Sequence, residues 1–161
     1  MRAVISADGR YRYRLERSVS DVPGPTVAFV MLNPSTADAE KDDPTIRRCI
    51  GFAERLGFSR LVVVNLFALR ATDPSALLAD PDPEGPDNID YLRTARVDYD
   101  LCIAAWGAHR AIRRLSAQAS YWLGDIPPAK GLVALGLTKD GAPRHPLYLK
   151  ADSPLIPWRL P

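Results

Sequence analysis

Two asparagines stand directly after apolar segments, and at one of them, Asn65, a residue kept only for stability would be apolar. Asn33 follows an apolar run that begins at Val27, and Asn65 follows the apolar run 61–64. A carboxamide offers both a donor and an acceptor, so it can orient a water molecule or bind the edge of a small ring. His145 lies farther along the chain and can stabilise negative charge that develops during a reaction. These three residues are the first candidates for chemistry.

The residues before these candidates form short apolar runs that are typical of buried strands. Each run carries no charge and is bounded by turn residues, as expected for strands covered on both faces in a parallel sheet. Segments with helical spacing separate the runs. Because ligands bind at the carboxyl ends of parallel strands, the polar residues after the runs should meet at one edge of the sheet. The expected strands are 27–32, 61–67, 101–105 and 132–137, and the expected helices are 44–56, 89–98 and 108–121.

This order of elements predicts a single α/β domain over residues 1–161. We expect three layers, α/β/α, around a central four-stranded parallel sheet, because strand–helix–strand crossovers place helices over the sheet with a fixed hand. Residues 1–19 are expected to form an N-terminal β-hairpin ahead of this sheet. The pair Asp8 and Gly9 favours a two-residue turn with positive φ at both positions.

A basic face follows this turn. Arg10, Arg12 and Arg14 alternate with Tyr11 and Tyr13, which is the period of a strand. The arginine face is either the solvated side of an edge hairpin, where charges discourage pairing with other strands, or a surface for a polyanion.

The composition is ordinary for a globular domain, with 47% hydrophobic and 25% charged residues. No apolar run approaches the ~20 residues of a membrane crossing, and no signal-peptide pattern opens the chain, so we expect a cytoplasmic protein without a membrane partner. Cys49 and Cys102 lie in apolar patterns and are expected to be buried free thiols of a reducing compartment. The cysteines and the two histidines are far apart in sequence, so no metal or other cofactor is expected.

The distribution of charge and the motifs present exclude some classes of function and leave others open. Eight lysines and arginines against three aspartates follow position 100, and this basic third either faces phosphates or is a solvated helix surface. No strand ends in a glycine-rich phosphate loop, so nucleotide binding of the P-loop or dinucleotide type is not indicated. No G-x-S-x-G motif occurs, which argues against an acyl hydrolase.

Four motifs at strand ends resemble those of the uracil-DNA glycosylase superfamily. The first strand of these enzymes ends in Asp or Asn followed by Pro, and the mismatch-specific branch has Asn-Pro, as at Asn33 and Pro34. Their second strand ends in an Asn that reads the base edge, which is similar to Asn65. A Trp-Gly follows the third strand and a His-Pro loop follows the fourth. The matching segments are 32–35, 62–65, 105–108 and 144–147.

This resemblance implies a DNA glycosylase-like enzyme that recognises a flipped base and hydrolyses the N-glycosidic bond, in DNA repair or the processing of modified bases. Asn33 would position the water, and His145 would stabilise the departing base. Asn65 would read the base, while Phe67 or Trp106 would stack on its ring. The partner would be DNA, bound with modest and salt-dependent affinity, or a nucleobase or nucleotide. The further substrate-binding residues that the resemblance implies are Pro34, Ser35, Gly107, Leu147 and Tyr148.

The chain departs from the superfamily pattern in two places. The last motif reads His-Pro-Leu-Tyr-Leu from His145, so the serine that usually grips a phosphate is absent. No carboxylate follows the first strand directly, which leaves the activation of water in question. These departures favour, as an alternative, a catalytically inactive nucleic-acid or nucleotide-binding protein. A second alternative is a metal-dependent hydrolase that uses the acidic loop 38–43, unless these acids form a solvated loop with a helix cap.

A closer resemblance is to an uncharacterised bacterial and phage family called domain of unknown function 1643. It is carried by the motifs at 33–38, 42–45, 64–68 and 70–74 and covers nearly the whole chain. This resemblance implies the fold and no established activity.

Each candidate also has a structural interpretation. Asn33 can be a turn residue before Pro34, and Asn65 can be a buried amide that bonds to the backbone. Trp106 can belong to the core, and His145 can bond to a backbone carbonyl. The sequence does not indicate the oligomeric state. Whether Asn33, Asn65 and His145 line one cleft decides between these interpretations.

Overall fold

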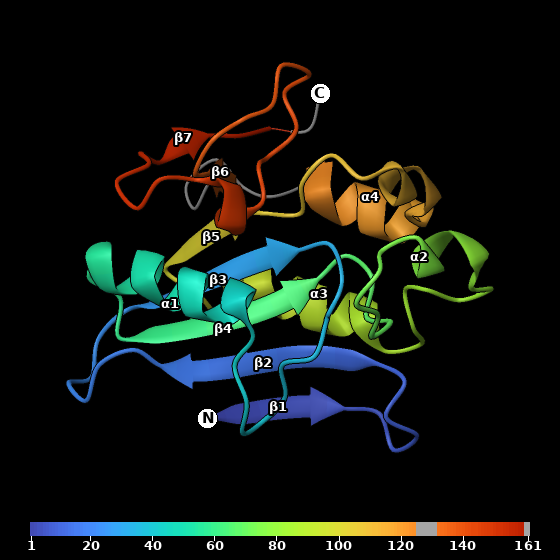
Figure 1. Ribbon diagram of the computed structural model, residues 1–161, viewed down its shortest axis with the longest axis horizontal. Helices are drawn as coiled ribbons and strands as arrows, with labels where there is room; N and C mark the ends of the chain where they lie inside the picture. The colour runs from blue at the N-terminus through green and yellow to red at the C-terminus, as the bar shows by residue number, and fades with distance from the viewer. Residues whose placement is uncertain (125–131, 160–161) are drawn as a thin grey trace.

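The chain folds around one β-sheet of seven strands in the computed structural model, which describes residues 1–124 and 132–159 (Figure 1). Residues 125–131 and 160–161 of the expected domain lie outside the described residues. The strands are β1 (Arg2–Ile5), β2 (Arg12–Ser18), β3 (Thr26–Met31), β4 (Arg60–Asn65), β5 (Leu101–Ala104), β6 (Leu132–Ala134) and β7 (Ile156–Pro157). The helices are α1 (Pro44–Arg55), α2 (Ala76–Ala79), α3 (Asn88–Val97) and α4 (Ala117–Gly124), with the 3-10 helices η1 (Arg110–Arg114) and η3 (Pro146–Tyr148).

Parallel strands form the middle of the sheet. The strand order is β1-β2-β4-β3-β5-β6-β7, and the neighbours from β4 to β6 are parallel. β2 pairs antiparallel with β4, and β7 pairs antiparallel with β6. The predicted α/β class is confirmed, and the four strands expected to be parallel are the middle of a larger sheet that also contains β1, β2 and β7. Strand β2 of the hairpin and strand β7 of the tail pair with β4 and β6, the two outer strands of the parallel group, whose outward backbone N–H and C=O groups would otherwise lack partners.

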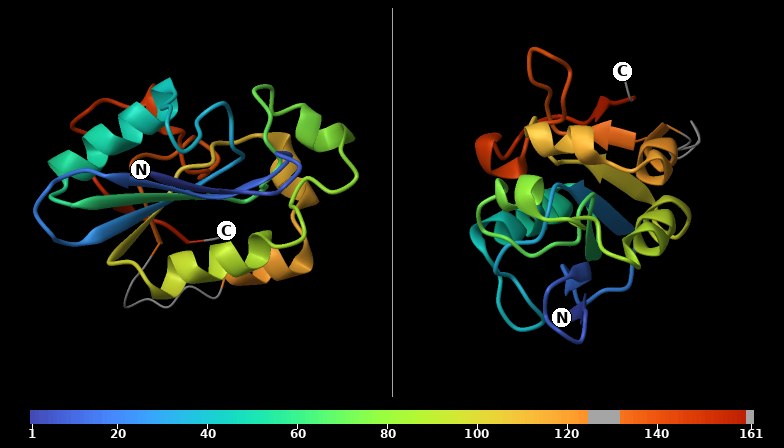
Figure 2. Two further views of the ribbon diagram at one scale, coloured as in Figure 1. Left: turned by 90° about the horizontal axis from the view of Figure 1, so that it is seen from below. Right: turned by 90° about the vertical axis from the view of Figure 1, so that its right-hand side faces the viewer.

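Helices cover both faces of the sheet. In Figure 2, α1 lies on one face, and α3 and α4 lie on the other. The buried apolar side chains divide accordingly: Phe29 packs with Phe52 of α1, while Val30 packs with Leu92 of α3. Successive residues of a strand point to opposite faces, so a strand between two helical layers needs apolar residues at every position. This explains the uncharged runs in the sequence.

Helix α1 begins at the predicted residue. Asp43 is its N-cap and accepts a hydrogen bond from the Ile46 backbone N–H at 2.8 Å, and Pro44 occupies the first helical position. Gly57 follows the helix with a φ of +78°, a conformation that glycine adopts without strain. The helix start also brings Asp43 to a cavity where β3 and β4 end.

The predicted helix over 108–121 is wrong, because the segment is interrupted. The 3-10 helix η1 ends before Leu115, whose ψ of 135° is extended. Ser116 then starts α4, and its hydroxyl accepts a hydrogen bond from the Ala119 N–H at 3.1 Å. A serine at a helix start competes for the backbone in this way, so one amphipathic pattern becomes two helices.

The hairpin is present, but its turn differs from the predicted type. Of the two expected turn residues, only Gly9 has a positive φ, +73°. In the described part of the chain, every residue with a positive φ is a glycine. The Gly9 N–H donates to the Ser6 carbonyl at 2.9 Å, so the turn spans residues 6–9 and Asp8 keeps an ordinary conformation.

A β-bulge in β2 determines the side of the sheet on which Arg12 lies. Arg14 and Arg12 pair with adjacent residues of β1, so Tyr13 is an inserted residue. Tyr13 packs in the core on the α3 side, whereas Leu15 packs on the α1 side. The bulge brings Arg12 to the α1 side too, where its Nη1 donates to the Ala37 carbonyl at 2.6 Å. A solvated arginine face is therefore wrong for Arg12, which is 2% exposed.

Both cysteines lie in the interior of the fold. Cys49 and Cys102 are buried free thiols, as predicted, and burial raises the pKa of both, that of Cys102 to about 12. Within the described residues, every helix is too short or too polar to cross a membrane.

Gly85 is predicted to be essential for the packing of Tyr11. Its φ is +83°, and a Cβ at this position would lie 2.8 Å from Cδ1 of Tyr11. Gly57 has a φ of +78°, but a Cβ there would meet nothing within 4 Å. Gly57→Ala should lower the free energy of unfolding by about 1–2 kcal/mol through backbone strain. Gly85→Ala should lower the free energy of unfolding by roughly 1–3 kcal/mol more than Gly57→Ala, because the added Cβ would also overpack against Tyr11. Urea denaturation of both variants checks this, and equal losses would contradict it.

Candidate functional site

A cavity of about 170 Å³ opens where β3 and β4 end, on the face covered by α1. It is smaller than the ~300–1,000 Å³ of sites for drug-sized ligands, so it suits a ligand of about one ring. The structure brings Asn33, Ser35, Asn65 and His145 together around it. The other residues that line the cavity are Arg12, Met31, Asp43, Thr45, Ile46, Ala71 and Thr72.

The chain after β4 runs alongside the chain after β3 and fixes the position of Asn33. The backbone N–H groups of 66–67 donate to the carbonyls of 31–32 at 2.9 Å, and the Ala71 N–H donates to the Pro34 carbonyl at 2.9 Å. Nδ2 of Asn33 donates to the Ala71 carbonyl at 2.8 Å and to the Pro34 carbonyl at 3.0 Å. Its Oδ1 makes no hydrogen bond with the described residues, so this oxygen is available to a water or a ligand.

Asn65 carries two unpaired polar atoms beside the cavity. The residue is 1% exposed, and neither Oδ1 nor Nδ2 has a hydrogen-bond partner within the described residues. In-register pairing with Met31 puts its side chain on the α1 face. Leaving such a group unpaired costs about 1–3 kcal/mol. The side chain therefore presents a donor and an acceptor to whatever occupies the cavity.

Asn88, which the sequence analysis did not single out, holds the end of β4. It is the first residue of α3 and is 2% exposed. Its Nδ2 donates to the carbonyls of Asn65 at 2.9 Å and Leu66 at 3.1 Å. From sequence, an asparagine at the start of a helix predicts a helix cap. Its hydrogen bonds to carbonyls at the end of β4 depend on the tertiary structure, so the sequence does not predict them.

His145 brings a neutral imidazole to the cavity. Its Nδ1 accepts a hydrogen bond from the Leu147 N–H at 3.4 Å, which places the ring proton on Nε2. Burial lowers the pKa of His145, and the nearby carboxylate of Asp43 opposes this shift. The segment is held against α1, because the Arg48 guanidinium donates to the Leu149 carbonyl. Nε2 is therefore a hydrogen-bond donor near neutral pH.

A carboxylate reaches the cavity from the start of α1. Asp43 lines the cavity while its Oδ1 accepts the Ile46 N–H. Its Oδ2 makes no hydrogen bond with the described residues. The sequence identifies Asp43 as a helix cap, but the return of the intervening loop to the end of β3 is a tertiary feature. The structure thus places one carboxylate at the cavity, although none directly follows the first strand.

Arg12 places a buried positive charge at the cavity wall. Its Nη1 donates to the Ala37 carbonyl, and its Nε is buried without a partner in the described part of the chain. Burial lowers the pKa of Arg12 to about 10, so the guanidinium remains cationic at neutral pH. The sequence does not identify Arg12 as a cavity residue. The alternation of residues in β2 predicts that Arg12 points outward, and the bulge that turns it inward has no pattern of its own in the sequence.

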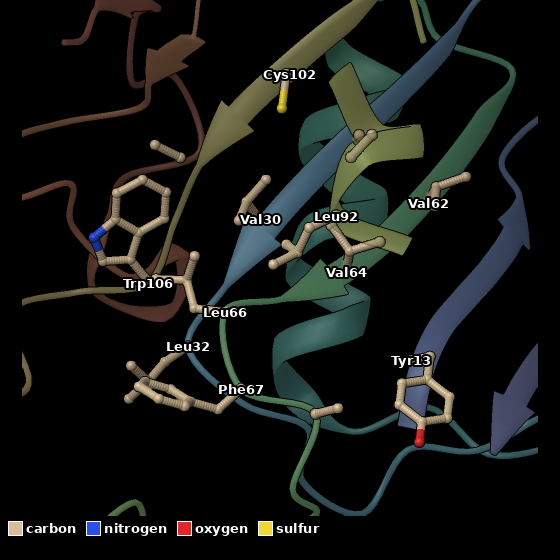
Figure 3. Packing of buried hydrophobic residues seen from close by; sticks show 14 of the residues in the cluster. Tyr13, Val30, Leu32, Val62, Val64, Leu66, Phe67, Leu92, Cys102 and Trp106 are labelled. Carbon is tan, nitrogen blue, oxygen red and sulfur yellow. The ribbon is translucent and has the colours of Figure 1, made fainter. Parts of the chain in front are cut away.

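Two predicted stacking residues lie away from the cavity. Phe67 and Trp106 belong to the core on the α3 face, where Figure 3 shows them with Leu66. Trp106 packs edge-on against Trp158, with ring centroids 4.9 Å apart. Neither ring lines the cavity, so the arrangement gives no support to stacking on a ligand there.

Four other predicted residues contribute around the cavity rather than in its lining. The Gly107 N–H donates to the Pro143 carbonyl at 2.9 Å, which ties the end of β5 to the segment that carries His145. Pro34 is buried and contributes its carbonyl to Asn33 and Ala71. Leu147 and Tyr148 are exposed beside His145.

The acidic loop does not form a metal site. Asp38 accepts two backbone N–H groups of its own loop at 2.9 Å, and Asp42 pairs with Arg17 at 2.7 Å. Asp43 caps α1. Among residues 1–124 and 132–159, no group of three His, Cys, Asp or Glu side chains is arranged to hold a metal ion. The geometry therefore does not support the metal-dependent alternative.

Comparison with known proteins gives a family match. A family described as "Protein of unknown function (DUF1643)" matches residues 12–147. No curated protein and no solved structure matches the chain. The matched range includes every residue that lines the cavity, from Arg12 to His145. The closer of the two resemblances is thereby confirmed.

Asn65→Leu is expected to leave the free energy of unfolding unchanged or to raise it by up to about 1–3 kcal/mol, because it removes two buried atoms without partners. Asn88→Leu is the matched control. It removes two hydrogen bonds, so it should lower the free energy of unfolding by about 1–3 kcal/mol. Urea denaturation measures both. A loss at Asn65 as large as that at Asn88 would show that Asn65 is a structural amide.

His145 is expected to make stability depend on pH. Its pKa in the folded chain is below the ordinary value of 6.5, so the unfolded chain binds a proton first as the pH falls. The contribution of neutral His145 to the free energy of unfolding is complete above about pH 6.5. It is lost as the pH falls through the pKa of His145 in the folded chain. His145→Asn should remove this part of the pH dependence, measured by thermal denaturation.

The matched control for this prediction is His109→Asn. His109 also caps a 3-10 helix through its Nδ1, but it does not line the cavity. The prediction is wrong if wild type and His145→Asn lose stability equally between neutral and mildly acidic pH.

Proposed function

The chain belongs to this family of unknown function, and from the geometry of its cavity we propose that it recognises a flipped nucleobase and hydrolyses the N-glycosidic bond, as DNA glycosylases do. The observation that carries the proposal is the unpaired carboxamide of Asn65 at a cavity suited to one ring. A base edge presents donors and acceptors side by side, which a carboxamide complements. The strand-end motifs that resemble the uracil-DNA glycosylase superfamily support the same assignment.

The polar groups at the cavity match the needs of this reaction. The oxygen of a water molecule bonds to the sugar carbon while the bond from that carbon to the base nitrogen breaks, and the base leaves with the bonding electrons. Asp43 takes the proton of the water, which Oδ1 of Asn33 orients. The Nε2–H of His145 donates to the departing base and stabilises its negative charge. Asn65 holds the base by its edge.

Exposed side chains beside the cavity support a nucleic-acid substrate. Leu147 is 43% exposed and Tyr148 is 73% exposed, and the Tyr148 ring centroid lies 5.8 Å from that of His145. Apolar side chains that enter a base stack help to unstack a base from the duplex. Arg144 is also exposed in this segment and can contact a phosphate.

The test uses oligonucleotides that carry uracil, hypoxanthine or a mismatch, with abasic sites detected by alkaline cleavage. Wild type is expected to form abasic sites on at least one of these substrates. Asn65→Ala should lower the rate by about tenfold or more, because it removes the contact to the base edge. His109→Asn should leave the rate unchanged, since His109 lies outside the cavity lining.

A second outcome would identify a binding protein without catalysis. In that case no abasic site forms, yet base-dependent binding is present in wild type and absent in Asn65→Ala. If neither cleavage nor base-dependent binding occurs on any of the three substrates, the proposed function is wrong.

A further inference from the structure

Two arginines of β2 are buried to the same extent, but only one has a counter-ion. Arg12 and Arg17 are each 2% exposed. Nε of Arg17 pairs with Asp42 at 2.7 Å, and its two other nitrogens donate to backbone carbonyls. Arg12 has one hydrogen bond, to the Ala37 carbonyl, and no ion pair within the described residues.

The surroundings of Arg12 do not neutralise its charge. Arg70 and Arg17 lie close enough to lower its pKa further, and Arg70 also has a buried, unpaired Nε. Asp43 and Asp38 raise the pKa of Arg12, but neither carboxylate reaches ion-pair distance from it. A buried charge without a partner is costly. A guanidinium kept in this state at a cavity wall therefore indicates an anionic occupant.

We infer that the cavity binds its base as an anion, with Arg12 as the counter-ion. The inference rests on the proposed function, because it concerns the charge of a base in the same cavity. A base that leaves with the electrons of the N-glycosidic bond is an anion whose charge is shared between ring nitrogen and carbonyl oxygen. A guanidinium makes strong charge-assisted hydrogen bonds to such an oxygen, whereas Asn65 and neutral His145 offer uncharged donors.

The test compares the binding of uracil with that of 6-azauracil, measured by isothermal titration calorimetry. The two have nearly the same shape, but the ring N–H of 6-azauracil is more acidic, so at mildly alkaline pH it is largely an anion while uracil is neutral. Wild type is expected to bind 6-azauracil about ten- to hundredfold more tightly than uracil.

Three variants attribute this preference to the charge at Arg12. In Arg12→Met the two ligands should bind about equally, and Arg12→Lys, which keeps a positive charge, should retain part of the preference. Arg17→Met is the matched control, because it removes a buried arginine of the same strand that does not line the cavity. It should keep the full preference. A preference that persists in Arg12→Met overturns the inference.

The remaining outcomes separate this inference from the proposed function. If wild type binds both ligands equally, and Asn65→Ala loses both, the inference is wrong and the proposed base recognition stands. If wild type binds neither ligand, the inference is wrong, and the oligonucleotide test alone decides the proposed function. Arg12-dependent binding of inorganic phosphate in that last case would show that the counter-ion belongs to a phosphate site and not to a base.

Discussion

The in-register parallel pairing of β3 with β4 is the constraint on which the candidate site depends. It places Asn65 opposite Met31 and sends its side chain to the α1 face. A shift of one residue would turn that side chain into the core that packs against α3. The same pairing continues beyond the strands, so the loop after β4 supplies the carbonyl of Ala71 that holds Asn33. One register therefore positions both asparagines.

Asn65 and Arg12 at the cavity differ from the other buried asparagine and arginine in how their polar atoms are paired. Both polar atoms of the Asn65 side chain lack partners in the described residues, whereas Asn88 lacks one only for its Oδ1 and donates two hydrogen bonds through Nδ2. Arg17 is buried as deeply as Arg12, yet it pairs with Asp42. The unpaired atoms of Asn65 and Arg12 lower stability, and the apolar layers on both faces of the sheet offset that loss. This contrast between like residues links the unpaired groups to a ligand.

The charges at the cavity act on one another. Asp43, Arg12 and His145 all line the cavity, so a carboxylate, a guanidinium and an imidazole share one small volume, and the carboxylate favours the charged forms of the other two. Burial opposes both shifts because it disfavours the charged forms. The result is a cation and a neutral hydrogen-bond donor beside a carboxylate. This combination suits a reaction in which a proton is removed from water while negative charge develops on a leaving group.

Local patterns in the chain were enough to establish the α/β class, the start of α1 at Asp43 and the strand-end positions of Asn33 and Asn65. Uncharged apolar runs, a helix cap and a proline act through neighbouring residues, so their consequences can be deduced from the order of residues alone. Three features required the tertiary structure: the hairpin joins the sheet, the bulge at Tyr13 turns Arg12 inward, and Trp106 faces the far core. Each depends on pairing between segments distant in the chain, where one inserted residue reverses the face that a side chain occupies. Local periodicity does not encode such pairings.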